Sequence, residues 1–147
     1  MPARTRLSIV TPSALKFQGE AELVVAPGAA GDLGALAHHA PMLTTLRTGV
    51  VSATIAAGAA GDDQSASRAT ERIQFAVDGG FMQILPDHVV ILTDLALSRD
   101  EIDVEAARAD LKRAEEALSQ KKGADDAHER RDLAWAHARL AITARPL

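Results

Sequence analysis

The stretch Arg72-Ile-Gln-Phe-Ala-Val-Asp-Gly-Gly-Phe-Met-Gln-Ile-Leu85 shows most clearly what the amino-terminal part of the chain forms. Ile73, Phe75 and Val77 alternate with less apolar side chains, which is typical of a strand with one buried face. Asp78-Gly79-Gly80 then supplies turn-forming residues, and a second apolar run follows. We therefore expect two short strands joined by a tight glycine turn, with Phe81 as a core aromatic.

Similar short runs occur on both sides of this stretch. They are bounded by Gly, Pro or Asp and recur at roughly 8–12-residue spacing, which favours a β-sandwich or barrel. The segment 56–70 is rich in Gly, Asp and small residues and predicts a long loop. The glycine-rich segment 28–34 predicts a turn-rich loop that needs positive φ. Together with 72–77 and 80–85 of the stretch above, the strand-like runs are 7–11, 21–26, 49–55 and 88–93.

The composition changes near residue 98. Residues 1–98 contain 6 basic and 9 acidic residues, whereas the 49 residues of 99–147 contain 10 basic and 11 acidic ones. Nine of the 10 Gly and five of the 6 Pro lie before residue 99. Dense mixed charge with Ala and Leu is typical of exposed helices. The expected domains are therefore 1–98, made of strands, and 99–147, made of helices.

The carboxy-terminal segment predicts a two-helix antiparallel hairpin. Apolar residues recur at 3- and 4-residue spacing from Val104 to Leu118, which places them on one helix face. Gly123 is the expected stop of this helix, and Asp125-Asp126 would begin a second helix that ends near Thr143. Because the second helix is rich in Ala, the hairpin buries little area. It is either a movable element or simply packs on the sandwich.

Composition and motifs argue against several classes of function. The formal charge is −4, which gives no general attraction to nucleic acid. The chain has no Cys, which excludes disulfides, thiolate catalysis and Cys-ligated zinc. No apolar stretch is long enough to span a bilayer, so no direct membrane insertion is expected. No Lys-Ser or Lys-Thr follows the last Gly of segment 28–34, so a phosphate-binding loop is not expected. His38 and His39 are adjacent and make poor metal co-ligands. Neither a catalytic site nor a cofactor is expected, which favours a binding role over an enzyme.

The basic residues of the last helix form the most notable charge pattern. Arg130, Arg131 and Arg139 lie on it, with Arg145 after it. Two interpretations stay open. The helix docks on an acidic partner, or its arginines form a solvated face with nearby carboxylates as partners. Similarly, His39 is either an exposed contact residue or a solvated loop histidine.

Three segments together resemble one known family. Residues 7–20 are Leu-Ser-Ile-Val-Thr-Pro-Ser-Ala-Leu-Lys-Phe-Gln-Gly-Glu. Residues 27–44 are Pro-Gly-Ala-Ala-Gly-Asp-Leu-Gly-Ala-Leu-Ala-His-His-Ala-Pro-Met-Leu-Thr, and residues 75–81 end in Asp-Gly-Gly-Phe. In order, spacing and residue type they resemble the epsilon subunit of F-type ATP synthases, over about residues 5–118.

This resemblance implies a ten-stranded β-sandwich at 1–98 and a helical hairpin at 99–147. It implies a non-catalytic rotor subunit, peripheral on the cytoplasmic side of a bacterial inner membrane, that joins the gamma subunit to the membrane c-ring. It also implies that the hairpin can extend along gamma and restrain ATP hydrolysis by the alpha and beta subunits.

The resemblance also places roles on residues. Asp32 and His39 would contact the rotor ring, and Arg130, Arg131 and Arg139 would meet acidic loops of the catalytic subunits. Some family members bind ATP at the hairpin through an Ile/Leu-Asp-x-x-Arg-Ala pattern. Here Ala106 takes the Arg position, so no nucleotide site is expected. The alternative function is a stand-alone sandwich module for protein interaction or assembly.

Overall fold

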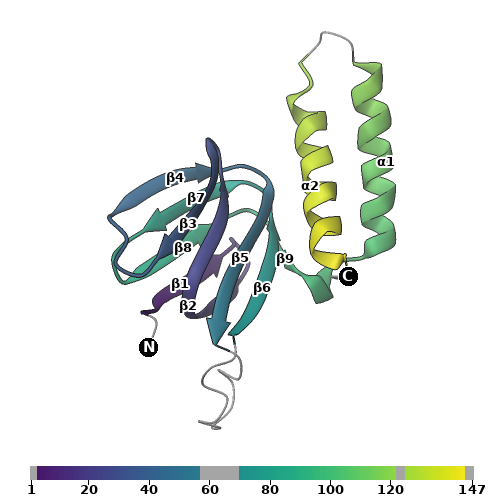
Figure 1. Cartoon of the computed structure of the whole chain (residues 1–147). Helices are drawn as coiled ribbons and strands as arrows, with labels where there is room; N and C mark the ends of the chain where they lie inside the picture. The colour runs from purple at the N-terminus through teal and green to yellow at the C-terminus, as the bar shows by residue number, and fades with distance from the viewer. Residues whose placement is uncertain (1–2, 57–69, 122–124, 145–147) are drawn as a thin grey trace.

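A computed structural model describes residues 3–56, 70–121 and 125–144 (Figure 1). These residues form a β-sandwich followed by two helices, as predicted. Nine strands and two helices are present in the described part of the chain. The strands are β1 (Thr5–Val10), β2 (Leu15–Gly28), β3 (Gly31–Leu36), β4 (Met42–Leu46), β5 (Gly49–Ala56), β6 (Thr70–Val77), β7 (Gly80–Ile84), β8 (His88–Leu92) and β9 (Ala96–Ser98).

The strands form two layers that share β2. One layer has the order β3-β2-β5-β6-β9, and the other has the order β4-β7-β8-β1-β2. The amino-terminal half of β2 pairs with β1, and its carboxy-terminal half lies between β3 and β5. A register shift between Ala21 and Leu23 marks where β2 passes from one layer to the other.

The expectation of ten strands is wrong for the described residues, which contain nine. The physical reason lies in β2. It runs without interruption for 14 residues and serves both layers, so one long strand takes the place of two short ones. Sequence patterns also missed β3, β4 and β9. Segment 28–34 turns only at residues 29 and 30, and β3 begins at Gly31, whose φ of 137° confirms the expected positive φ. The predicted 56–70 loop lies almost entirely outside the described residues.

The core lies between the two layers and follows the alternation of each strand. Leu7 and Ile9 of β1, Met82 and Ile84 of β7, and Val24 of β2 are all fully buried. Each such side chain contributes about 1.5–3 kcal/mol when it is removed from water. Both layers are therefore fixed relative to each other by the inward-facing residues.

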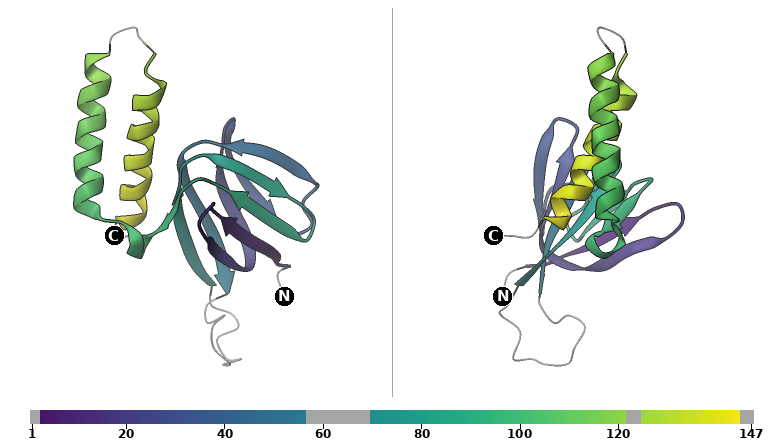
Figure 2. Two further views of the ribbon diagram at one scale, coloured as in Figure 1. Left: turned by 180° about the vertical axis from the view of Figure 1, so that it is seen from behind. Right: turned by 90° about the vertical axis from the view of Figure 1, so that its right-hand side faces the viewer.

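The hairpin consists of α1 (Val104–Gln120) and α2 (Ala127–Thr143). Asp103 caps α1 by accepting a hydrogen bond of 3.1 Å from the Ala106 amide. Near the tip, Lys121 Nζ lies 2.7 Å from a Glu129 carboxylate oxygen, and this contact lowers the pKa of Glu129 and raises the pKa of Lys121. The predicted helix stop at Gly123 lies outside the described residues. Figure 2 shows that α2 is the helix nearer the sandwich.

A 3-10 turn, Arg99–Glu101, connects the sandwich to the hairpin. Lys16 of β2 donates a hydrogen bond to the Glu101 carboxylate, and this bond is the main reason why the pKa of Glu101 lies below the usual 4.5 of a glutamate. The pair therefore ties the connector to the sandwich while Glu101 is ionised.

This contact predicts a pH-dependent contribution to stability. Because the pKa of Glu101 is lowered by folding, the contribution is present at neutral pH and is lost as the pH falls through the folded-state pKa. The free energy of unfolding of wild type should exceed that of Lys16→Ala at neutral pH, and the difference should shrink as the pH falls below 4.5, the usual pKa of a glutamate, and through the lower folded-state pKa of Glu101. Urea unfolding across this pH range measures the difference. A difference independent of pH would contradict the assignment.

Candidate interaction surfaces

Helix α2 covers one outer face of the sandwich. Ala138 and Ile142 of α2 pack on Ala76 of β6, and all three are buried. Val50, Ile102 and Trp135 complete this contact as partly buried neighbours. The small side chains allow a close approach but bury little apolar area, so this contact alone holds the hairpin weakly.

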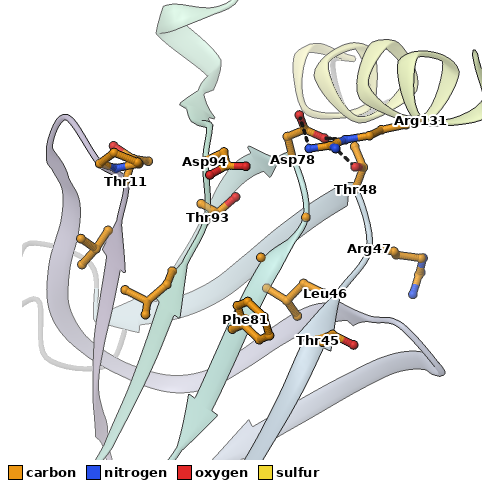
Figure 3. Close-up of a pocket in the computed structure, with 15 residues that line it drawn as sticks. Thr11, Thr45, Leu46, Arg47, Thr48, Asp78, Phe81, Thr93, Asp94 and Arg131 are labelled. Atoms are coloured by element: carbon orange, nitrogen blue, oxygen red, sulfur yellow. Dashed lines mark hydrogen bonds and ion pairs between the residues drawn. The ribbon is translucent and has the colours of Figure 1, made fainter. Parts of the chain in front are cut away.

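The start of α2 is held to the sandwich by charge. Arg131 donates through Nε and Nη2 to the two carboxylate oxygens of Asp78, at 3.0 and 3.1 Å (Figure 3). Asp78 lies in the β6–β7 turn and also accepts a 2.7 Å hydrogen bond from Thr48 Oγ1. The Asp78 carboxylate raises the pKa of Arg131, so the guanidinium is always charged. Such a two-point contact is the strong form of an ion pair.

Arg139 instead holds the two helices together. Its side chain is only 11% exposed, and Nη2 donates a 2.9 Å hydrogen bond to Asp110 of α1. Its guanidinium carbon lies 5.3 Å from the centre of the Trp135 ring, within the range of a cation–π contact.

Arg130 takes part in neither of these contacts. It pairs with Asp126 one turn earlier at 2.9 Å, and its side chain is 67% exposed. The three predicted arginines thus have three different environments. Nearby carboxylates explain the Arg130 pair, but Asp78 and Asp110 lie 53 and 29 residues away from their partners. No local signal in the sequence could have identified those two partners.

The outer face of the other layer forms an apolar row, which we call the uncovered face. Register places Phe81 directly beside Leu92, and Leu92 beside Val10; Leu43 lies on the same face of β4. Leu43 is 69% exposed, and Phe81 and Leu92 are each 52% exposed. Among the described residues, the main helix contacts go to β5, β6 and the 3-10 turn, not to this layer. Exposed apolar rows of this kind mark interaction sites.

The prediction that Phe81 belongs to the core is wrong. On β7 the inward positions are Met82 and Ile84, so Phe81 points outward. The tight glycine turn before it is confirmed. Gly79 and Gly80 have φ of 72° and 114°, and a Cβ at Gly80 would lie 2.0 Å from the Leu92 carbonyl oxygen. Only glycine fits there.

The structure does not bring Asp32 and His39 together. Asp32 lies at the start of β3 and pairs with Arg47 in the β4–β5 turn. His39 lies beyond the other end of β3, where the amide of His38 donates to the Pro86 carbonyl at 2.8 Å. The two side chains therefore lie at opposite ends of the sandwich, and a single flat contact would not include both.

An open pocket of ≈ 730 Å³ lies where the sandwich turns meet α2. Asp78, Arg131, Phe81 and Leu92 are among the residues that line it, so it connects the ion pair to the uncovered face (Figure 3). Within the described ranges, no cluster of three or more His, Asp or Glu is placed to hold a metal ion. Neither described helix is long and apolar enough to cross a membrane.

Comparison with known proteins gives matches along nearly the whole chain. Residues 4–99 match the family described as "ATP synthase, Delta/Epsilon chain, beta-sandwich domain", and residues 100–143 match "ATP synthase, Delta/Epsilon chain, long alpha-helix domain". The "ATP synthase epsilon chain" of Moorella thermoacetica is 42% identical over 139 residues, which cover 94% of this chain and 95% of that protein. The protein of the same name from Paramagnetospirillum magneticum is 34% identical over 145 residues, 98% of this chain and 100% of that protein.

Solved structures agree in fold. A chain in the mitochondrial ATP synthase of Euglena gracilis, solved with its c-ring, superposes with a TM-score of 0.74 at 19% identity, covering 98% of this chain and 84% of that chain. A chain in the central stalk and c-ring of the Tetrahymena thermophila enzyme gives 0.57 at 12% identity, covering 97% and 98%. At these identities the likeness concerns the fold alone.

Proposed function

The chain belongs to the delta/epsilon chain family of ATP synthase, and from this premise we propose that its sandwich joins the gamma subunit to the c-ring while its hairpin restrains ATP hydrolysis. The family makes it a non-catalytic subunit of the rotary complex. The relatives from Moorella thermoacetica and Paramagnetospirillum magneticum support a place on the cytoplasmic side of the bacterial inner membrane for the complex that it joins.

The observation that carries this proposal is the asymmetry of the two outer faces. Helix α2 occupies one face, and the other presents Leu43, Phe81 and Leu92 to solvent. Covering such a row with a partner removes apolar surface from water, which favours binding. We assign the uncovered face to the gamma subunit, which as the axle needs a firm attachment that survives torque.

Asp32 and its partner Arg47 supply the polar surface for the ring. They lie at the end of the sandwich formed by the β2–β3 and β4–β5 turns, and both side chains are about half exposed or more. Charged groups at the rim of an interface set register and orientation more than affinity. His39 lies at the other end, next to the strand that begins with Met42, so we assign it to the gamma side of the sandwich and not to the ring.

The hairpin supplies the restraint on hydrolysis. Arg130 and Arg131 have side chains that are 67% and 54% exposed, and they can face acidic loops of the alpha and beta subunits when the hairpin leaves the sandwich. Arg139 is held between the helices, so its role is to keep α1 and α2 together during that movement.

Reassembly of the complex tests the ring contact. A catalytic head that lacks this subunit is mixed with ring-containing membranes and either wild-type chain, Asp32→Ala or Asp87→Ala. Wild type should restore attachment, and Asp32→Ala should weaken it about tenfold at low salt and less at high salt, since the loss of a rim charge acts mainly on salt-dependent association. Asp87→Ala is the matched control, because it removes an exposed carboxylate from the β7–β8 turn at the other end of the sandwich, and it should leave ring attachment unchanged.

Two results would contradict the proposal. Wild-type chain that restores no attachment would remove the proposed function and favour a stand-alone interaction module. A loss of ring attachment with Asp87→Ala alone would reverse the assignment of the two ends of the sandwich. Sedimentation of the head with the membranes, at two salt concentrations, gives the measurement.

A further inference from the structure

We propose that Asp78 and Arg131 form an ionic latch that keeps the hairpin folded on the sandwich, and that Asp78 competes with acidic partner loops for the same guanidinium. The first part concerns this chain alone. The second part rests on the proposed function, because it requires that the extended hairpin meets the catalytic subunits.

Asp78 is held ready to accept Arg131. Its side chain is 15% exposed and takes a 2.7 Å hydrogen bond from Thr48 Oγ1, and its amide donates to the Leu95 carbonyl at 3.1 Å. The two glycines that follow adopt positive φ in a turn that only glycine fits. The carboxylate is therefore fixed before Arg131 arrives, which lowers the entropic cost of the contact.

Arg131 is the one helix residue that makes this connection. Of the ion pairs among the described residues, Arg131–Asp78 is the only one that joins α1 or α2 to a strand layer. The neighbouring Arg130 pairs within α2, and Arg139 pairs with α1. Removal of this contact therefore frees the start of α2 without disturbing the packing of the hairpin itself.

The position of the latch suits a movable element. Arg131 lies near the start of α2, and the apolar contact of Ile142 lies 11 residues later, about 16 Å along the helix. Ile142 packs close to Ile102, next to the 3-10 turn that leads into the hairpin. The apolar contact thus extends from Trp135 and Ala138 to Ile142 near the hinge, and the latch lies beyond its far end, toward the tip of the hairpin. The open pocket beside Arg131 gives its side chain room to leave Asp78.

Competition follows from the geometry of the guanidinium. Two of its nitrogens already serve the two oxygens of Asp78, so a second carboxylate cannot take the same bidentate position. Asp78→Asn should then favour the extended hairpin and release Arg131 to its partner. Arg131→Gln should also favour the extended hairpin but remove the partner contact as well.

The first experiment measures hairpin position in the isolated full chain. The chain has no Cys, so the substitutions Ser13→Cys and Ser119→Cys, both at exposed positions, supply the only two thiols for nitroxide labels. Pulsed electron paramagnetic resonance then gives the distribution of distances between the label on the sandwich and the label on α1. Asp78→Asn and Arg131→Gln should each lower the ratio of folded to extended hairpin about tenfold. Arg130→Gln is the matched control and should match wild type.

The second experiment measures ATP hydrolysis by the reassembled complex. Asp78→Asn should lower it further than wild type does, and Arg131→Gln should raise it. Unchanged distances in both variants would overturn the latch. Changed distances with equal hydrolysis in all variants would keep the latch and remove the competition, and wild-type chain that does not affect hydrolysis at all would remove the inhibitory function on which the competition rests.

Discussion

Phe81→Asp is expected to lower the affinity of the chain for the gamma subunit by about 100-fold or more, as expected for a central hot-spot residue. Phe81 lies in the middle of the apolar row, between Thr45 and Leu92 in register. A carboxylate there would be buried against gamma without a counter-charge. This adds a desolvation cost to the loss of the contact that the Phe81 side chain makes. Titration of purified gamma with the labelled chain gives the dissociation constant.

The fold should survive this change, because the Phe81 side chain is 52% exposed and its inward neighbours carry the core. Leu36→Asp is the matched control. Leu36 is 60% exposed but belongs to β3 in the other layer, so the same loss of an exposed apolar side chain should leave the affinity for gamma unchanged. Equal losses in both variants would mean that the uncovered face is not the docking site.

Phe81 also shows where sequence patterns stop being informative. Alternation identifies two faces of a strand but not which face meets a partner, and an aromatic residue serves either purpose. Ala76 shows the same limit on β6. Alternation with Phe75 and Val77 predicts that it faces solvent, yet it is fully buried because α2 packs on that face. To predict that a strand is covered on both faces, one must also know where the helix packs.

Local features were predicted better than long-range ones. The apolar spacing from Val104 to Leu118 indicated α1, and Asp78-Gly79-Gly80 indicated a tight turn, since both depend on neighbouring residues. The pairing of Arg131 with Asp78 and the separation of Asp32 from His39 depend on how β2 bends and how α2 docks. Those features follow from packing of the whole chain, which a pattern along the sequence does not contain.

Truncation after Ser98 is expected to raise ATP hydrolysis by the reassembled complex at least about fivefold, the lower end of coupling between separate sites. The truncated chain keeps β1 to β9 and the whole uncovered face, so its binding to gamma should be unchanged. It loses the hairpin together with all three arginines, and therefore every charge through which we propose that it restrains the catalytic subunits.

A second truncation, after Lys121, separates the helices. It removes α2 with Arg130, Arg131 and Arg139 but keeps α1. If the arginines of α2 carry the restraint, both truncations should raise hydrolysis equally, whereas a contribution from α1 itself would leave the longer chain partly inhibitory. Steady-state hydrolysis at saturating amounts of each chain measures this, with binding to gamma verified in the same samples. Hydrolysis that stays at the full-length value in both would show that the hairpin does not restrain the enzyme, because either cut removes the contacts from which the effect was argued.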